Sequence, residues 1–120
     1  MNTNTDTTIN FGGVTMSSTR YARISRAHQE LTDAVGRAGA GPRAAAVEAS
    51  AKIWRELGPR HTWSAADLKR EAAACTAAMQ AHPDYPEWIR LSREIEDRIA
   101  ANRAKGRPLL AYTDSDWSGQ

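Results

Sequence analysis

Apolar and polar residues alternate at the start of the chain, in the segment TINFGGVTM at 8–16. A two-residue turn at Gly12 and Gly13 would bring the four apolar side chains of this segment to one face of a ribbon. The facing pairs would be Ile9 with Met16 and Phe11 with Val14. The pattern predicts a β-hairpin within an N-terminal arm of residues 1–18. Because a lone hairpin is marginal in water, we expect this face to pack on its own chain or on another one.

After residue 17 the apolar residues follow a helical spacing instead. The first predicted helix begins at an N-cap in the cluster at 17–19 and has one stripe of residues at steps of three and four. The stripe consists of Tyr21, Ile24, His28, Leu31, Val35 and Ala38. The glycines of GRAGAG at 36–41 predict that this helix stops in a loop, and Pro42 suits the first turn of the next helix.

The second helix is predicted over 42–57, where Gly58 and Pro59 end it. Its expected inward residues are Ala46, Val47, Ser50, Ile53, Trp54 and Leu57. Ser64 followed by Asp67 has the spacing of a capping box and predicts the start of a third helix. The inward stripe of that helix would consist of Leu68, Ala72, Cys75, Met79 and His82.

A second capping pattern, Asp84 with Glu87, predicts a fourth helix that tolerates Pro86 in its first turn and runs to Lys105. Its inward residues would be Trp88, Leu91, Ile95 and Ile99. Gly106 then provides a C-cap, and the tail at 108–120 follows neither a helical nor a disordered pattern.

The expected fold is therefore mainly α: a small antiparallel four-helix bundle over 19–107, with an N-terminal β-hairpin arm and an irregular C-terminal tail. The short connections favour antiparallel neighbours. Alanine occupies many of the stripe positions, so the core should be thin, and a homo-oligomer or a partner chain would add stability.

Composition agrees with one domain, because 120 residues with 41% hydrophobic and 25% charged residues suffice for a single core. No apolar run approaches the roughly 20 residues needed to cross a bilayer, and the first ten residues lack a signal-peptide pattern. We therefore expect a cytoplasmic protein with no membrane partner. A single cysteine fits a reducing compartment, and the use of Arg and Ala is typical of a bacterium or phage.

Positive charge is concentrated in the first half of the chain. The net charge is +2, but eight basic and four acidic residues leave an excess of four between 19 and 63. Arg20, Arg23 and Arg26 advance in threes along one flank of the first predicted helix, and the excess continues to Arg60. These residues support nucleic-acid binding as an alternative function. The connection after Gly58 is longer than that of a helix-turn-helix, which counts against sequence-specific readout.

Catalytic and metal-binding patterns are not predicted. Cys75 and His82 share a helical face, but with His28 and His61 they lack the paired spacing of a zinc site. The GRAGAG segment follows a helix and lacks the Lys-Ser/Thr ending of a phosphate loop. We therefore expect no cofactor, no metal and no enzymatic activity.

The stretch YTDSDWSG at 112–119 is similar to the aspartate motif in the ribonuclease H region of copia-type retrotransposons. In that family an acidic residue on a strand binds metal. The similarity covers eight residues, and no sheet is predicted around them.

The sequence thus favours a non-catalytic protein that binds another protein, as an adaptor, an assembly subunit or an inhibitor. An inhibitor of a host defence complex is one instance. The expected interface consists of the hairpin residues Ile9, Phe11, Val14 and Met16, a helical face, and the aromatic residues Tyr112 and Trp117, since aromatic anchors dominate many interfaces.

Overall fold

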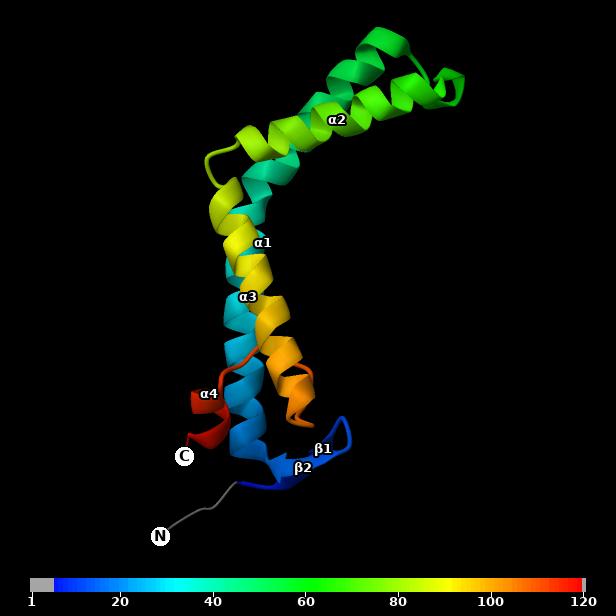
Figure 1. The fold of residues 1–120 in the computed structure, drawn as a ribbon. Coiled ribbons are helices and arrows are strands. Elements are labelled where there is room, and N and C mark those ends of the chain that lie inside the picture. Colours follow the sequence, from blue (N-terminus) through cyan, green and yellow to red (C-terminus); the bar gives the residue numbers. More distant parts are fainter. Residues whose placement is uncertain (1–5, 120) are drawn as a thin grey trace. The chain divides into compact units, whose positions relative to one another are not determined.

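The computed structural model describes residues 6–119 and is mainly helical, with an antiparallel hairpin at its N-terminal end (Figure 1). The elements are β1 (Thr8–Phe11), β2 (Val14–Ser17), α1 (Ser18–Leu57), the 3-10 turn η1 (Arg60–Thr62), α2 (Ala65–Ala81), α3 (Tyr85–Ala104) and α4 (Asp114–Ser118). They form two compact units. The first contains the chain up to Ala34 and from Leu91 onward, and the second is Val35–Arg90.

The predicted β-hairpin is confirmed in both its register and its turn. Ile9 pairs with Met16, and Phe11 pairs with Val14. Gly12 and Gly13 have φ angles of 59° and 80°, as a two-residue turn of type I′ requires. Alternation and turn chemistry are local signals, so the sequence alone sufficed to predict this element.

The start of α1 is capped from two sides. The Ser17 hydroxyl accepts a hydrogen bond from the Arg20 backbone N–H at 3.1 Å, as the predicted N-cap cluster requires. The Asp6 carboxylate accepts from the Thr19 backbone N–H at 2.9 Å and from the Ser18 hydroxyl at 2.8 Å. These hydrogen bonds, the one from the Thr19 N–H first, lower the pKa of Asp6 below its ordinary value. Asp6 is thereby tied to the start of α1.

The predicted loop at GRAGAG is wrong, because α1 continues through it as a single helix of 40 residues with Pro42 inside. Two of its glycines are needed for close packing rather than for a turn. A Cβ atom at Gly39 would lie 2.5 Å from Nε1 of Trp88, and one at Gly41 would collide with the ring of His82. These tertiary contacts outweigh the low helix propensity of glycine and the hydrogen bond that Pro42 cannot donate.

The core of the first unit joins the hairpin, the first turns of α1 and the C-terminal segment. Its most buried members are Met16, Ile24 and Tyr112. The half-buried apolar residues packed against them are Ile9, Phe11, Val14, Tyr21, Ala27, Leu110 and Trp117. Phe11 and Tyr21 meet edge to face with ring centroids 5.3 Å apart. The apolar face of the hairpin is therefore covered by the same chain.

The C-terminal segment is held against this core by hydrogen bonds. The Asn102 side chain, 2% exposed, donates to the carbonyls of Leu110 at 2.8 Å and Tyr112 at 3.1 Å. The Ala111 backbone N–H donates to Nδ1 of His28 at 2.9 Å. The predicted irregular tail ends in a short helix, α4, whose capping box pairs Thr113 with Asp116.

The second unit contains a helical hairpin made by the second half of α1 and by α2. The Cys75 thiol donates to the Ala46 carbonyl at 3.3 Å, and the Ser50 hydroxyl donates to the Glu71 carboxylate at 2.8 Å. Residue numbers rise along α1 as they fall along α2, so the two helices are antiparallel. The predicted capping box at Ser64 is confirmed.

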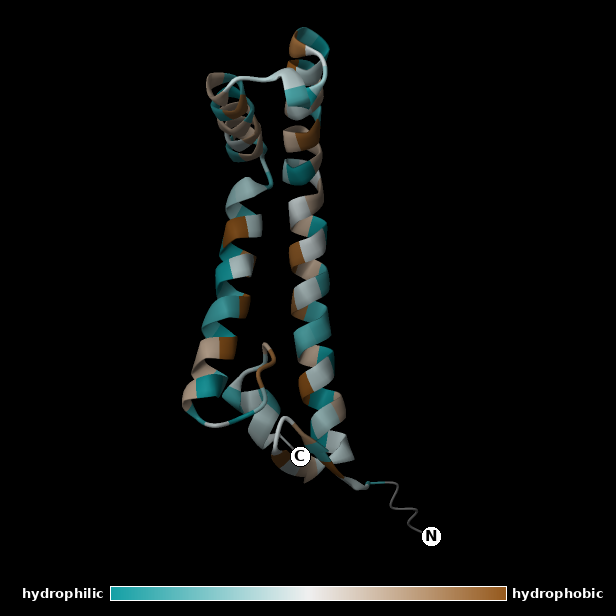
Figure 2. Cartoon of the chain, turned by 90° about the vertical axis from the view of Figure 1, so that its right-hand side faces the viewer, coloured by the Kyte–Doolittle hydropathy of each residue, from teal (hydrophilic) through white to brown (hydrophobic). Residues whose placement is uncertain are grey.

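Because the first two predicted helices form one helix of 40 residues, the expected four-helix bundle is not confirmed. Hydrophobic residues recur at short intervals along α1 instead of gathering in one block (Figure 2). The mainly helical class, the hairpin and the ends of α3 near Asp84 and Gly106 agree with the sequence prediction.

Candidate protein-binding surface

The second half of α1 has two apolar stripes. One faces α2 and includes Pro42 and Ile53, which are both buried. The other follows steps of four, three, four and three residues, which keep side chains on one side of a helix. It consists of Ala40, Ala44, Val47, Ala51 and Trp54. Val47 is 70% exposed and Trp54 is 44% exposed, so this second stripe lies at the surface of the unit.

Helix α2 has a matching stripe beside the residues that contact α1. Glu71 and Cys75 face α1 through the hydrogen bonds described above. With about 100° of rotation per residue, the α2 positions next to Glu71 and Cys75 around the helix form a second uncharged row. It consists of Ala65, Leu68, Ala72, Thr76 and Met79. Leu68 is 41% exposed and Ala72 is exposed as well.

The two rows lie on the same side of the helical hairpin. The ion pair between Glu56 and Arg70 joins the helices on the opposite side. In two antiparallel helices, side chains that are rotated about their own helix axes by similar angles in the same sense from the line of contact lie on the same side of the pair. Both rows are rotated from that line in the sense opposite to Glu56 and Arg70. We call these ten residues the uncharged face. Glu48 and Lys52 of α1 line a hollow with Ala78 on the opposite, charged side.

These exposures correct the inward stripes predicted from the sequence. Val47 and Trp54 were expected to be buried in the second helix, and Leu68 and Ala72 in the third, yet all four are exposed. The inward position of α2 is instead taken by Glu71, a charged residue that the apolar pattern passes over. An uninterrupted second row at steps of three and four is the signal that would have revealed the face.

Trp54 is exposed but held in place. It meets Trp63 edge to face, with ring centroids 5.7 Å apart and an interplanar angle of 65°. The Trp63 indole in turn donates to the Gly58 carbonyl at 3.0 Å, and the Arg60 guanidinium lies 5.7 Å from its ring centroid. A fixed aromatic side chain loses little conformational freedom when a partner covers it, which favours its use as an anchor.

The six interface residues predicted from the arms all lie in the core of the first unit. Met16 and Tyr112 are 4% and 1% exposed. Ile9, Phe11, Val14 and Trp117 are half-buried around them. Burial raises the pKa of the Tyr112 phenol, whose hydroxyl donates to the Pro108 carbonyl at 3.1 Å. These side chains stabilise their own chain.

The basic residues predicted for nucleic-acid binding are mostly engaged within the chain. The Arg20 and Arg107 guanidiniums lie 4.5 and 4.9 Å from the Trp117 ring centroid. Arg23 donates to the Asp116 carbonyl at 2.9 Å and also to the Gly119 carbonyl. Arg60 pairs with Glu71 at 2.9 Å, whereas Arg26 is exposed. Three of the four predicted contacts thus hold the protein's own elements together.

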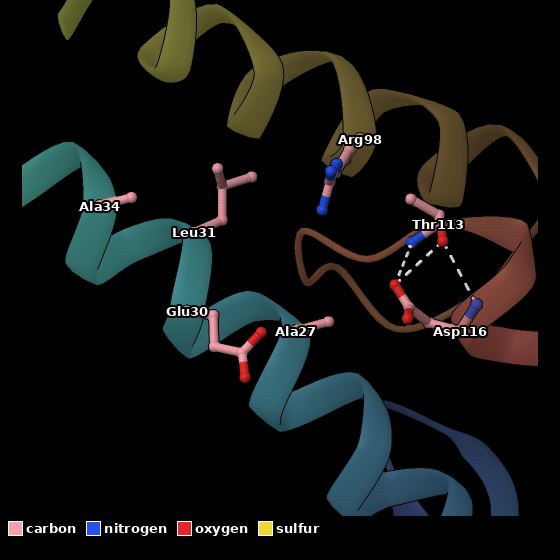
Figure 3. A pocket seen from close by; sticks show the side chains of 7 residues that line it. All are labelled: Ala27, Glu30, Leu31, Ala34, Arg98, Thr113 and Asp116. Atoms are coloured by element: carbon pink, nitrogen blue, oxygen red, sulfur yellow. Dashed lines mark hydrogen bonds between the residues drawn. The ribbon is translucent and has the colours of Figure 1, made fainter.

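The first unit contains a pocket of about 420 Å³ beside α4 (Figure 3). Arg98 and Asp116 are among its polar lining residues. Asp116 accepts from the Thr113 backbone N–H at 2.9 Å and from its hydroxyl at 3.0 Å, and Arg98 donates to Glu94 at 3.0 Å. The carboxylate of Asp116 and the guanidinium of Arg98 are thus both engaged in contacts within the fold.

The similarity to the retrotransposon aspartate motif does not extend to its structural context. Asp114 begins a helix rather than lying on a strand, and its carboxylate accepts from Lys105 and Arg107 at 2.6 and 2.7 Å. Between residues 6 and 119, no three His, Cys, Asp or Glu side chains gather as a metal site would require. Over the same residues, no helix has the length and apolar character needed to cross a bilayer.

In comparisons with known proteins, no family model, no curated protein and no solved structure matches this chain.

Proposed function

We propose that this protein is a non-catalytic protein-binding module, which works as an adaptor, assembly subunit or inhibitor through the uncharged face of its helical hairpin. The observation that carries the proposal is the exposure of Val47, Trp54 and Leu68 together on that one side. Large apolar side chains grouped on a surface are typical of an interaction site.

The contrast with the rest of the unit supports this assignment. The opposite side of the hairpin has the ion pair between Glu56 and Arg70 and the charged residues Glu48 and Lys52. The partner should therefore be another polypeptide with an uncharged, apolar surface. The arms support this role less well than the sequence led us to expect, because their apolar side chains are used in the core.

Site-specific photo-cross-linking in a lysate of the source cells tests the proposal. A benzophenone amino acid replaces Val47 on the uncharged face or, as a matched control, Lys52 on the charged side of the same helix. We expect an adduct with a second polypeptide from position 47 and none from position 52. If neither position yields an adduct, or both yield the same ones, the proposal is wrong.

A further inference from the structure

The backbone at 110–112 packs in the core of the first unit but belongs to no helix or strand, so side chains satisfy part of its hydrogen-bonding groups. Asn102 donates to the carbonyls of Leu110 and Tyr112, and Nδ1 of His28 accepts from the Ala111 N–H at 2.9 Å. Ala111 is 0% exposed, so water does not reach this residue. The histidine therefore supplies the acceptor for a fully buried stretch of backbone.

This hydrogen bond depends on the protonation state of the imidazole ring. A ring nitrogen accepts a hydrogen bond only while it carries no proton, so the bond to Ala111 requires the neutral ring with its proton on Nε2. The imidazolium has an N–H on both nitrogens. Protonation would thus set two donors 2.9 Å apart and leave the Ala111 N–H without an acceptor, which disfavours the buried arrangement.

We propose that His28 is a pH-sensitive switch, which holds the C-terminal segment at 108–119 while its ring is neutral and releases this segment when the ring gains a proton. Histidine is the side chain that ordinarily changes its charge between about pH 8 and 5. The segment is therefore held at the upper end of this range and released toward the lower end. The switch lies in the first unit, so it is independent of the uncharged face in the second.

Release of the segment would uncover apolar surface. Leu110, Tyr112 and Trp117 pack against Met16 and Ile24, which are 4% and 0% exposed while the segment is in place. Figure 1 shows α4 beside the first turns of α1, in agreement with these contacts. Without the segment, this apolar core and the inner face of the hairpin become accessible. The neutral form thus hides a second apolar surface, and acid presents it.

The other titratable groups around this core have partners of their own. The strands β1 and β2 contribute none, because their eight residues are apolar or uncharged. Side chains of the types that α1, α3 and the C-terminal segment contribute ordinarily titrate below about pH 5 or above about pH 9, outside the range of histidine. They are Arg20, Tyr21 and Arg23 of α1, Glu94 and Arg98 of α3, and Lys105, Arg107, Tyr112, Asp114 and Asp116.

Hydrogen exchange of the full-length protein and of His28→Asn tests the proposal. The asparagine side chain keeps an oxygen acceptor at the position of Nδ1 but takes up no proton. The ratio of the two proteins' exchange rates at one pH cancels the intrinsic pH dependence of exchange. We expect the amides of 110–119 to exchange at similar rates at pH 8, and about tenfold faster in the wild type than in His28→Asn at pH 5. A ratio that stays the same from pH 8 to pH 5 overturns the proposal.

His82→Asn is the matched control. Nδ1 of His82 also accepts a backbone N–H, that of Asp84 at 3.1 Å, but Asp84 is exposed and lies in the second unit. This variant should keep the full pH response of the C-terminal segment. Loss of the response in His82→Asn would assign it to a group other than His28.

A measurement on the wild type keeps the proposal testable should His28→Asn unfold. Nitrogen-15 spectra follow the protonation of the His28 ring and the Ala111 amide in a single titration. We expect both signals to change together, with one midpoint. An Ala111 amide that stays unchanged while the ring gains its proton overturns the proposal, and so does a ring that is still neutral at pH 5.

Discussion

The Glu71 carboxylate of α2 accepts a hydrogen bond from the Ser50 hydroxyl of α1 at 2.8 Å. Its other oxygen pairs with Arg60 at 2.9 Å, and the Glu71 side chain is only 8% exposed. One buried carboxylate thus ties together both helices of the hairpin and the turn between them. Since a buried charge is tolerated only with such partners, we expect the three groups to act together.

Replacing Glu71 by alanine should therefore lower the free energy of unfolding by about 2 kcal/mol, because Ser50 loses its acceptor and a buried position loses packing. The matched control is Glu56→Ala, which removes a surface ion pair with Arg70 and should cost less than about 1 kcal/mol. Urea unfolding at one fixed protein concentration measures both. Equal losses in the two variants would contradict the role assigned to Glu71.

The three glycines of GRAGAG should respond differently to alanine. Gly36 lies in α1 with no atom near the position of an added Cβ, so Gly36→Ala should raise the free energy of unfolding by about 0.5 to 1 kcal/mol through helix propensity. Gly39→Ala must displace the Trp88 ring, and Gly41→Ala the His82 ring. Both should lower stability, by about 1 to 3 kcal/mol.

Thermal unfolding followed by circular dichroism gives the sign of each change directly. Three stabilised variants would mean that the segment is only a sequence of poor helix formers. They would also contradict the close approach of Trp88 and His82 to α1.

The glycines of GRAGAG separate the elements that the sequence could predict from those that it could not. The hairpin, the caps at Ser17 and Ser64 and the end of α3 depend on a few neighbouring residues, so local patterns were sufficient. The continuity of α1 depends on aromatic rings from α3 and from the end of α2, far along the chain. Propensity alone cannot detect such contacts, and the prediction of a loop was wrong for that reason.

The binding surface was missed for a related physical reason. A helix that packs against one neighbour and also has an exposed apolar surface carries two apolar rows. A prediction that expects one stripe combines the residues of both rows. The predicted stripe of the second helix combined inward Ile53 with outward Val47 and Trp54. The pattern of apolar residues could not identify Glu71 as an inward residue, because the burial of this carboxylate depends on its partners Ser50 and Arg60.

Acid should weaken the attachment of the C-terminal segment. Hydrogen bonds from Lys105 and, next, Arg107 lower the pKa of Asp114 below its ordinary value of 3.8. A carboxylate with a lowered pKa in the folded state adds stability above its ordinary value, and this stability is lost as the pH falls through the folded-state pKa. The unfolding temperature should therefore drop more in the wild type than in Asp114→Asn when the pH is taken from 7 to below about 3.

The comparison between the two proteins isolates Asp114 from other carboxylates, including Asp6 and Glu87, whose pKa values are also lowered. Asp114→Asn should be the less stable protein at pH 7, and the two should converge in acid. If the unfolding temperatures of the two proteins differ by the same amount at every pH, the ion pairs of Asp114 with Lys105 and Arg107 do not contribute to stability.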